Sequence, residues 1–288
     1  MASLTLDSPM VVAILVIALL SYKNLPGIWH FRFFRAVLTR LYISPTTIDE
    51  LSPECLFLSA IHRTRAPLSE CDYNIHKSNS TYFMDIDISR GNLCLVLFSQ
   101  RLSFRPKHNT ASMALGGVQC IFKREIKPYQ PYEVWSRILS WDEKWIYIVT
   151  HFVVRGAHRP ARFRVQGQLN SEATARGKKR NQSDKEKGKT VFASAVSRFV
   201  FKQGRKTIAP ERMLVECGLL PPATAELDCE ISANDTNDCS QSERRLIEDR
   251  RKRDLDIAQL KLGWDAVYDT FEGDVSTALG RYTDLFWR

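Results

Sequence analysis

The chain has 288 residues, of which 44% are hydrophobic and 25% charged, so it can bury one sizeable core and carry additional segments. Its net charge is +9, but residues 155–189 hold eleven Lys or Arg and three acids, which accounts for +8 of that total. Because no basic stripe interleaved with aromatic residues lies on a regular element, we expect no nucleic-acid partner. The seven cysteines are odd in number and include no CxxC pair, which argues against a disulfide framework or a zinc site and fits a reducing compartment.

The N-terminus carries an uninterrupted apolar run over residues 10–20. A full membrane span needs about 20 apolar residues, and counting from Leu4 approaches that length only by including Asp7. No small-residue cleavage site follows the run, so a removed signal peptide is not expected. The length leaves open whether the run spans a bilayer or only anchors the chain.

Residues 25–42 alternate aromatic side chains with Arg32, Arg35 and Arg40. Aromatic rings are typical of the headgroup boundary and arginines of contact with anionic lipid, so we predict that residues 1–48 attach the chain to a membrane. The positive charge follows the apolar run, which by the positive-inside rule places the rest of the chain in the cytoplasm. The alternative is an ordinary amphipathic helix packed on the domain.

The middle of the chain predicts one long helix among several strands. Within residues 80–100 five residues fall at helical spacing, with Ser78 or Asn79 placed to cap the helix: Tyr82, Ile86, Ser89, Leu93 and Leu97. Residues 84–89 also alternate as a strand would, but the length of the segment and the cap candidates favour a helix. Asp142 and Glu143 form a tight connection typical of a hairpin. One strand, then a helix, then four strands that can lie antiparallel predict an α+β fold. The strand-like segments are residues 54–64, 115–126, 132–141, 144–155 and 190–202.

Two further segments interrupt or follow this domain. Residues 156–189, rich in Lys, Ser and Gly in their second half, predict a flexible basic insertion between two strands. Beyond a short helix that follows Pro210, we expect an acidic linker and a helical extension. In that extension Ser240 and Glu243 match a capping box that opens a charged helix reaching about Leu262. The predicted organisation is an N-terminal segment, a central domain and a C-terminal extension over residues 1–48, 49–215 and 216–288.

A polar cluster, Asp72, Asn74 and His76, lies directly before the predicted long helix. Metal binding needs more ligands, and the other histidines show no ligand spacing. A structural loop would use the Asp and Asn side chains to satisfy turn backbone. The third interpretation is carbonyl chemistry, because an acid, an amide and an imidazole can activate a nucleophile while helix N–H groups stabilise an oxyanion. The residues alone leave the second and third interpretations open.

The stretch "DYNIHKSNSTYF" resembles the D-x-N-x-H-x-x-N-x-x-Y signature of plant acyl-carrier-protein thioesterases, with Asp72, Asn74, His76, Asn79 and Tyr82 at the matching positions. The chain therefore resembles the hotdog thioesterase superfamily. The layout is similar to fungal thioesterase-like proteins of secondary-metabolite clusters and to animal thioesterase-superfamily proteins with an apolar N-terminus. The resemblance implies a long central helix wrapped by an antiparallel sheet.

Catalytic roles follow from the resemblance. Asp72 would orient its neighbours or attack the thioester, and Asn74 would hold the carbonyl or a water. His76 would act as general base or hydrogen-bond donor, and Glu125, by its position in the second conserved stretch, would be the rival base. Substrate binding is implied for Asn79, Ser80, Tyr82, Gly116 and Gly117, the first two through backbone N–H groups and the glycines by close approach of a pantetheine arm.

The predicted function is hydrolysis of an acyl thioester, on coenzyme A or a carrier protein, by a membrane-associated enzyme without a cofactor or metal. The resemblance also implies a homodimer, because hotdog proteins generally pair with their sites at the interface. One alternative is a non-catalytic module that binds acyl chains or partner proteins. Another is a hotdog dehydratase, which also uses a histidine and an acid.

Overall fold

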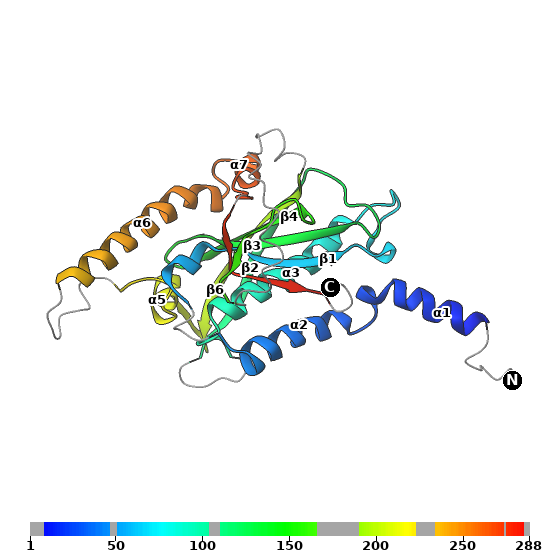
Figure 1. The fold of residues 1–288 in the computed structure, drawn as a ribbon, viewed down its shortest axis with the longest axis horizontal. Coiled ribbons are helices and arrows are strands. Elements are labelled where there is room, and N and C mark those ends of the chain that lie inside the picture. Colours follow the sequence, from blue (N-terminus) through cyan, green and yellow to red (C-terminus); the bar gives the residue numbers. More distant parts are fainter. Residues whose placement is uncertain are drawn as a thin grey trace.

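A twisted antiparallel sheet packs against one long helix, α3 (Asn79–Leu97), at the centre of the molecule (Figure 1). Two N-terminal helices precede it: α1 (Pro9–Leu20) projects from the body, and α2 (Ile28–Leu38) packs against α3. The C-terminal helices are α5 (Pro210–Glu216), α6 (Asn234–Ala258) and α7 (Trp264–Asp269). The computed structural model describes residues 9–46, 51–103, 110–165, 190–222, 234–273 and 275–284.

The main sheet has seven strands in the order β2-β6-β4-β3-β1-β9, with β7 pairing β6. Neighbouring strands are antiparallel except β1 and β9, which run parallel. The predicted α+β arrangement, a long helix wrapped by an antiparallel sheet, is therefore confirmed. The strands are β1 (Ala60–Arg65), β2 (Ser112–Phe122), β3 (Pro131–Trp141), β4 (Ile146–Val154), β6 (Val191–Gln203), β7 (Lys206–Ile208) and β9 (Gly280–Thr283), and β5 (Arg162–Phe163) pairs with β8 (Thr277–Ala278) apart from this sheet.

Helix α3 is buried on both sides, by the sheet and by α2. Ile86, Leu93 and Leu97 are fully buried at spacings that place them on one helix face. Gly91 lies on the other side, where an added Cβ would stand 3.4 Å from the Phe33 ring of α2. A glycine inside a helix costs about 1 kcal/mol relative to alanine, and here its missing side chain lets α2 approach closely.

Several predicted boundaries differ from the structure. The segment 54–64 is not one strand: a 3₁₀ turn covers Pro53–Phe57 and the strand starts at Ala60. The predicted capping box at Ser240 is wrong, because α6 already begins at Asn234. Strands β4 and β6 flank the basic insertion as predicted, but its residues 166–189 and the linker residues 223–233 lie outside the described part of the chain.

The N-terminal segment contacts the C-terminal strand, which the sequence did not indicate. Arg32 was predicted to face lipid, and this is wrong: its guanidinium is buried and contacts Asp284 at 2.7 Å, directly after β9. Arg35 donates to the Thr283 carbonyl at 2.9 Å, and Arg40 lies over the Tyr282 ring. Among the residues that the structure describes, no helix combines the length and apolarity needed to cross a membrane.

Candidate active site

Residues 71–77 form a tight loop directly before α3, closed by backbone hydrogen bonds. The Asp72 N–H donates to the His76 carbonyl at 3.0 Å, and the Ile75 N–H donates to the Asp72 carbonyl at 3.0 Å. The Asp72 carboxylate accepts the Asn74 N–H at 2.9 Å, an Asx turn that fixes the direction of the carboxylate. Ile75 adopts a φ of 60°, a conformation that is costly for a β-branched residue. This closure turns Asp72 and His76 toward one another.

His76 lies between two carboxylates. Its Nδ1 is 3.6 Å from Asp72 Oδ1, and its Nε2 is 3.8 Å from Glu125 Oε1. Glu125 reaches this position because the Lys77 N–H donates to the Ile126 carbonyl at 2.8 Å, which fixes the segment after β2 against the loop. The structure thus brings together three of the four residues to which the resemblance gives a catalytic role.

The three side chains remain open to solvent to different degrees. Asp72 and His76 keep 26% and 22% of their side-chain surface exposed, whereas Glu125 keeps 71%. The fourth predicted residue, Asn74, lies exposed at the tip of the loop. Both distances to the imidazole exceed the 2.7–3.2 Å that is typical of a hydrogen bond, and catalytic hydrogen bonds are often long before substrate binds. An accessible imidazole between two carboxylates can accept and deliver a proton.

The N-terminus of α3 lies next to this group. The helix begins at Asn79, three residues after His76, and the Asn79 and Ser80 residues are exposed. The Ser78 side chain at the N-cap does not accept a hydrogen bond from the N–H groups of the first helical turn. Its hydroxyl contacts the Ser80 hydroxyl at 3.1 Å instead. The first N–H groups of a helix lack intrahelical acceptors and carry the positive end of its dipole, so this terminus can stabilise negative charge on a carbonyl oxygen.

Gly116 and Gly117 are not brought to the loop, whereas Tyr82 lies beneath it, with the Lys77 ammonium 5.4 Å from the centre of its ring. The Tyr82 side chain is 2% exposed and packs in the core against the Phe122 ring at 5.0 Å. A Cβ on Gly116 would stand 2.0 Å from Trp145, so this glycine makes room for a tryptophan ring. Gly116 is six residues from the end of β2, roughly 20 Å along the strand.

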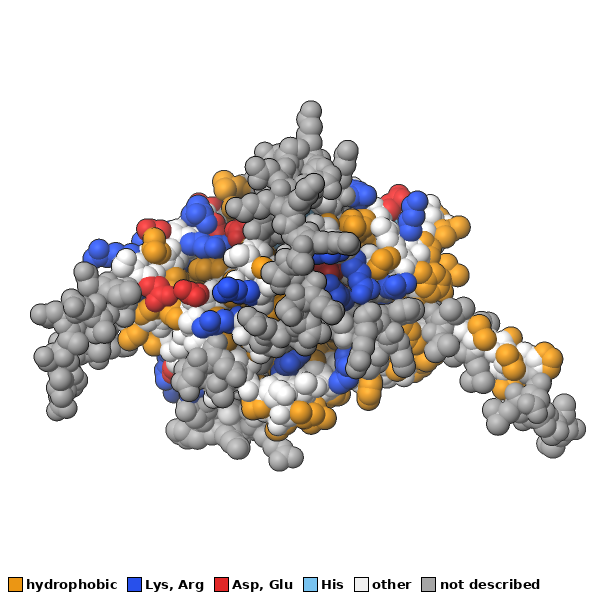
Figure 2. Space-filling model, in the orientation of Figure 1, with side chains coloured by type: hydrophobic (Ala, Val, Ile, Leu, Met, Phe, Trp, Pro, Cys, Tyr) orange, Lys and Arg blue, Asp and Glu red, His pale blue; other side chains and the backbone are white. Residues whose placement is uncertain are grey.

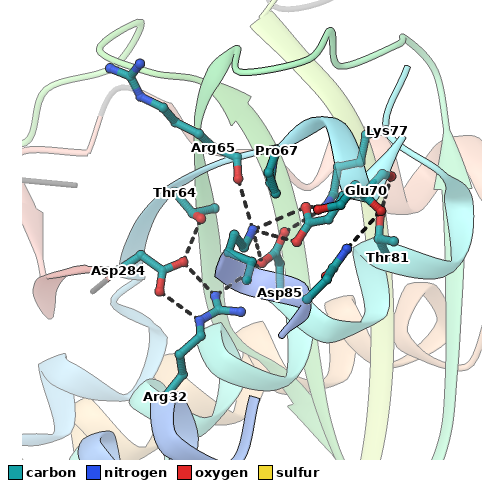
Figure 3. A network of polar contacts seen from close by, with 12 residues as sticks. Arg32, Thr64, Arg65, Pro67, Glu70, Lys77, Thr81, Asp85 and Asp284 are labelled. Carbon is teal, nitrogen blue, oxygen red and sulfur yellow. Dashed lines mark hydrogen bonds and ion pairs between the residues drawn. The ribbon is translucent and has the colours of Figure 1, made fainter. Parts of the chain in front are cut away.

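A buried group of charges lies at the base of the loop. The Lys77 ammonium contacts Glu70 at 2.6 Å and Asp85 at 3.0 Å. Lys23, from the turn between α1 and α2, contacts the same two carboxylates at 3.0 Å each. It also donates to the Arg65 carbonyl at 3.0 Å. Figure 3 shows Glu70, Lys77 and Asp85 pointing toward one another. The charge cluster consists of Lys23, Arg32, Glu70, Lys77, Asp85 and Asp284.

Arg32 extends the charge cluster to the C-terminal strand. It forms two bonds of 2.7 Å with the Asp284 carboxylate and lies 3.4 Å from Asp85. Thr64 on β1 donates to Asp284 at 2.8 Å, and the Tyr132 hydroxyl on β3 donates to Asp85. Three cations therefore face three carboxylates, and all six side chains are nearly inaccessible to water.

Opposite charges outweigh the effect of burial on the pKa at Asp85, Asp284 and Lys23. Burial alone would raise the pKa of Asp85, but Lys23, Lys77 and Arg32 together hold that pKa well below its usual range. Burial would also raise the pKa of Asp284, but the neighbouring Arg32 guanidinium lowers it below the ordinary value. Burial would lower the pKa of Lys23, yet Asp85 and Glu70 raise it above the ordinary value. A lowered carboxyl pKa stabilises the fold above the unfolded value of about 4 and loses that contribution as the pH falls further.

The charge cluster sets the position of the loop. Glu70 and Lys77 flank residues 71–76 on both sides, and their side chains are tied to each other and to Asp85 of α3. The Ser78 N–H also donates to the Glu70 carbonyl at 2.8 Å. Sequence reasoning did not identify these residues. One signal was present: Asp85 interrupts the apolar face of a predicted helix.

Comparison with known proteins relates the sequence of this chain to one family. Residues 66–210 match the Thioesterase-like superfamily. The chain is 37% identical to "Probable thioesterase atnL" of Emericella nidulans over 93% of this chain and 90% of that protein. It is 40% identical to "Thioesterase poxG" of Penicillium oxalicum over 89% of this chain and 85% of that protein. The crystal structure of the YbaW probable thioesterase from Escherichia coli aligns with a TM-score of 0.37 and 15% identity, over 56% of this chain and 96% of that chain.

Replacing Lys23 by methionine tests whether the charge cluster stabilises the fold. The change leaves Glu70 and Asp85 buried with one cation fewer, so we expect the free energy of unfolding to fall by about 3–5 kcal/mol in denaturant titrations. Lys206→Met, at an exposed position on β7, is the matched control and should change it by less than about 0.5 kcal/mol.

Combining Lys23→Met with Asp85→Asn removes one cation and one carboxylate from the charge cluster. We expect this pair to be less destabilising than the sum of the two single changes. Additive losses, or a Lys23→Met protein as stable as the control, would contradict a role for this cluster in stability.

Proposed function

This chain belongs to the thioesterase-like superfamily, and we propose that it hydrolyses acyl thioesters carried by coenzyme A or a carrier protein. The observation that carries the proposal is the position of His76, between Asp72 and Glu125 and three residues before α3. Thioester hydrolysis needs a group that removes a proton from water and a donor that receives negative charge on the carbonyl oxygen. The loop supplies the first, and the start of α3 supplies the second.

In the proposed reaction the thioester carbonyl oxygen faces the N–H groups of Asn79 and Ser80. A water oxygen attacks the carbonyl carbon while His76 accepts a water proton, and negative charge develops on the carbonyl oxygen. The carbon–sulfur bond then breaks, and the thiolate leaves with the proton that His76 returns. The products are a carboxylic acid and a free thiol. Asp72 orients the imidazole through Nδ1, which leaves Nε2 for the water and for Glu125.

Substitution of the three acid–base residues separates their roles. We expect Asp72→Asn and His76→Ala to lower kcat for acyl-CoA hydrolysis by roughly 10²–10⁴-fold, the usual contribution of a positioned acid–base group. Glu125→Gln should cost less, because its carboxylate is mostly exposed and weakly coupled through solvent. Thiol release during single turnovers measures these changes.

Glu143→Gln, an exposed acid in the β3–β4 turn, is the control and should retain wild-type kcat. Thermal melts confirm that each variant is folded. Full activity in all three site variants would contradict the proposal, and acyl-CoA binding without thiol release by the wild type would instead indicate a binding module. A dehydrated acyl product would identify a dehydratase.

We also propose a homodimer, supported by the exposed edge of β2. The strand order ends at β2, and Leu115 and Phe122 on this strand are 45% and 37% exposed. An apolar strand edge is a template for pairing with a second copy. Sedimentation equilibrium should give a dimer for the wild type and a monomer for Leu115→Lys, with Leu262→Lys as an exposed control. A monomeric wild type at all concentrations would contradict this assembly.

Attachment to a membrane surface on the cytoplasmic side stays a proposal, supported by the two faces of α2. One face packs on α3, whereas Phe31, Phe34 and Leu38 on the other are 56%, 57% and 53% exposed. Figure 2 shows hydrophobic side chains along the lower edge of the molecule and on the projecting α1. Aromatic side chains on an exposed helix face are typical of interfacial membrane binding.

Co-sedimentation with anionic lipid vesicles tests the α2 surface. Phe31→Ser with Phe34→Ser should weaken vesicle binding at least about tenfold, because each ring contributes on the order of 1–2 kcal/mol when it leaves water. Leu246→Ser, 68% exposed on α6, is the control and should bind as the wild type does.

Unchanged vesicle binding in the double variant would contradict this docking surface.

The cytoplasmic assignment has its own check, because Asn79, Ser80 and Thr81 form a glycosylation sequon at an exposed helix start. A glycan at Asn79 in cells would place the domain on the other side of the membrane.

A further inference from the structure

A cavity of about 430 Å³ lies between α2, α3 and the start of β2. Its volume falls in the range of about 300–1,000 Å³ that is typical of ligand pockets, and an apolar cavity of about 150 Å³ already holds benzene. Its lining combines aromatic and aliphatic side chains with one charged pair and two serines, Ser103 and Ser112. We call it the α2–α3 cavity, and the residues used below are Trp29, Phe33, Asp87, Arg90, Gly91 and Cys94.

The outer wall of the α2–α3 cavity comes from the N-terminal segment. Trp29 and Phe33 lie one turn apart on α2, and their rings stack with centroids 5.5 Å apart and planes 4° apart. Gly91 of α3 faces this wall, with Phe33 Cε2 3.4 Å from the place of a Cβ. Both aromatic residues lie outside residues 66–210, the part of the chain that matches the family. The N-terminal segment therefore supplies this wall, and α3 supplies the surface that faces it.

The two charged side chains in the α2–α3 cavity, Asp87 and Arg90, are already partnered within the protein. The Arg90 guanidinium contacts the Asp87 carboxylate and donates to Ser197 Oγ at 3.0 Å, and it lies over the Phe199 ring at 5.0 Å. A cation bound to a carboxylate and covering an aromatic ring does not require a charged ligand. Apart from the two serines, the rest of the lining named above is apolar, so the cavity suits a hydrocarbon.

The α2–α3 cavity lies on the same helix as the candidate active site. Ser80, Asp87, Gly91 and Cys94 follow one another at helical spacing along α3, so one line along the helix surface joins its N-terminus to the cavity. At 1.5 Å per residue, the cavity begins about 10 Å from Ser80 and reaches about 21 Å at Cys94. This length suits an extended acyl chain whose thioester lies at the start of the helix.

We propose that the α2–α3 cavity receives the distal end of the substrate acyl chain, and that Trp29 and Phe33 form the wall that limits chain length. The inference rests on the proposed hydrolysis of acyl thioesters and adds a specificity determinant to it. The N-terminal segment then acts as part of the substrate site, in addition to any contact with a membrane.

Two variants that change the α2–α3 cavity in opposite directions test the proposal. Trp29→Ala opens the wall and should raise the kcat/KM ratio of hexadecanoyl-CoA to dodecanoyl-CoA by about tenfold. Gly91→Leu places a side chain in the cavity while improving helix propensity, and it should lower the same ratio. Trp264→Ala, at an exposed tryptophan on α7, is the matched control and should leave the ratio unchanged.

A binding measurement that does not depend on hydrolysis provides the second readout. A dodecyl-CoA thioether with a terminal bromine cannot be hydrolysed, and its bromine quenches a nearby indole. We expect it to quench tryptophan emission of the full-length wild type, to lose the major part of that quenching in Trp29→Phe, and to retain it in Trp264→Phe, the exposed matched control on α7.

The two readouts distinguish failure of this inference from failure of the proposed function. A wild-type chain that releases no thiol yet shows Trp29-dependent quenching supports the cavity assignment and contradicts the hydrolase. An active wild type in which Trp29→Ala and Gly91→Leu keep the original chain-length ratio, and Trp29→Phe keeps the quenching, overturns the cavity assignment. Melting curves of both cavity variants show whether each is folded before its ratio is compared.

Discussion

The arrangement of this protein depends on a buried, neutral set of charges in which three carboxylates face three cations. Burying an isolated charge is costly, and these six charges are stabilised by one another and by neutral hydrogen-bond partners. Because Asp85 lies on the central helix and Tyr132 and Thr64 on the sheet also donate to the carboxylates, the charge cluster forms where helix and sheet meet. Its geometry therefore fixes parts of the chain that no hydrophobic contact alone would orient.

The charge cluster makes both terminal segments of the chain part of the fold. The sequence divides naturally into an N-terminal anchor, a central domain and a C-terminal extension, and each end looks dispensable. Yet Lys23 and Arg32 come from the N-terminal segment and Asp284 from the C-terminal one. Removal of residues 1–48 would leave three buried carboxylates with Lys77 alone as their cation. Both ends are therefore part of the structure that holds the loop with Asp72 and His76.

The same packing gives α2 two tasks. Its inner face carries Arg32 to the charge cluster and presents Trp29 and Phe33 to the cavity beside α3, while its outer face exposes other aromatic rings. Gly91 contributes to this packing, because an added Cβ would already be in van der Waals contact with the Phe33 ring. Stability, the proposed limit on acyl length and the proposed membrane contact thus depend on one short helix.

The sequence alone determined the α+β class, the presence of the long helix α3 and the polar cluster with Asp72 and His76 directly before it. These features depend on local periodicity and on short spacing, which a chain displays without tertiary information. Only the tertiary structure decided that Glu125 lies beside His76, that Tyr82 and Gly116 serve packing, and that Arg32 pairs with Asp284 across 252 positions. Such pairings depend on which segments become neighbours in the folded chain, and no local sequence pattern encodes that choice.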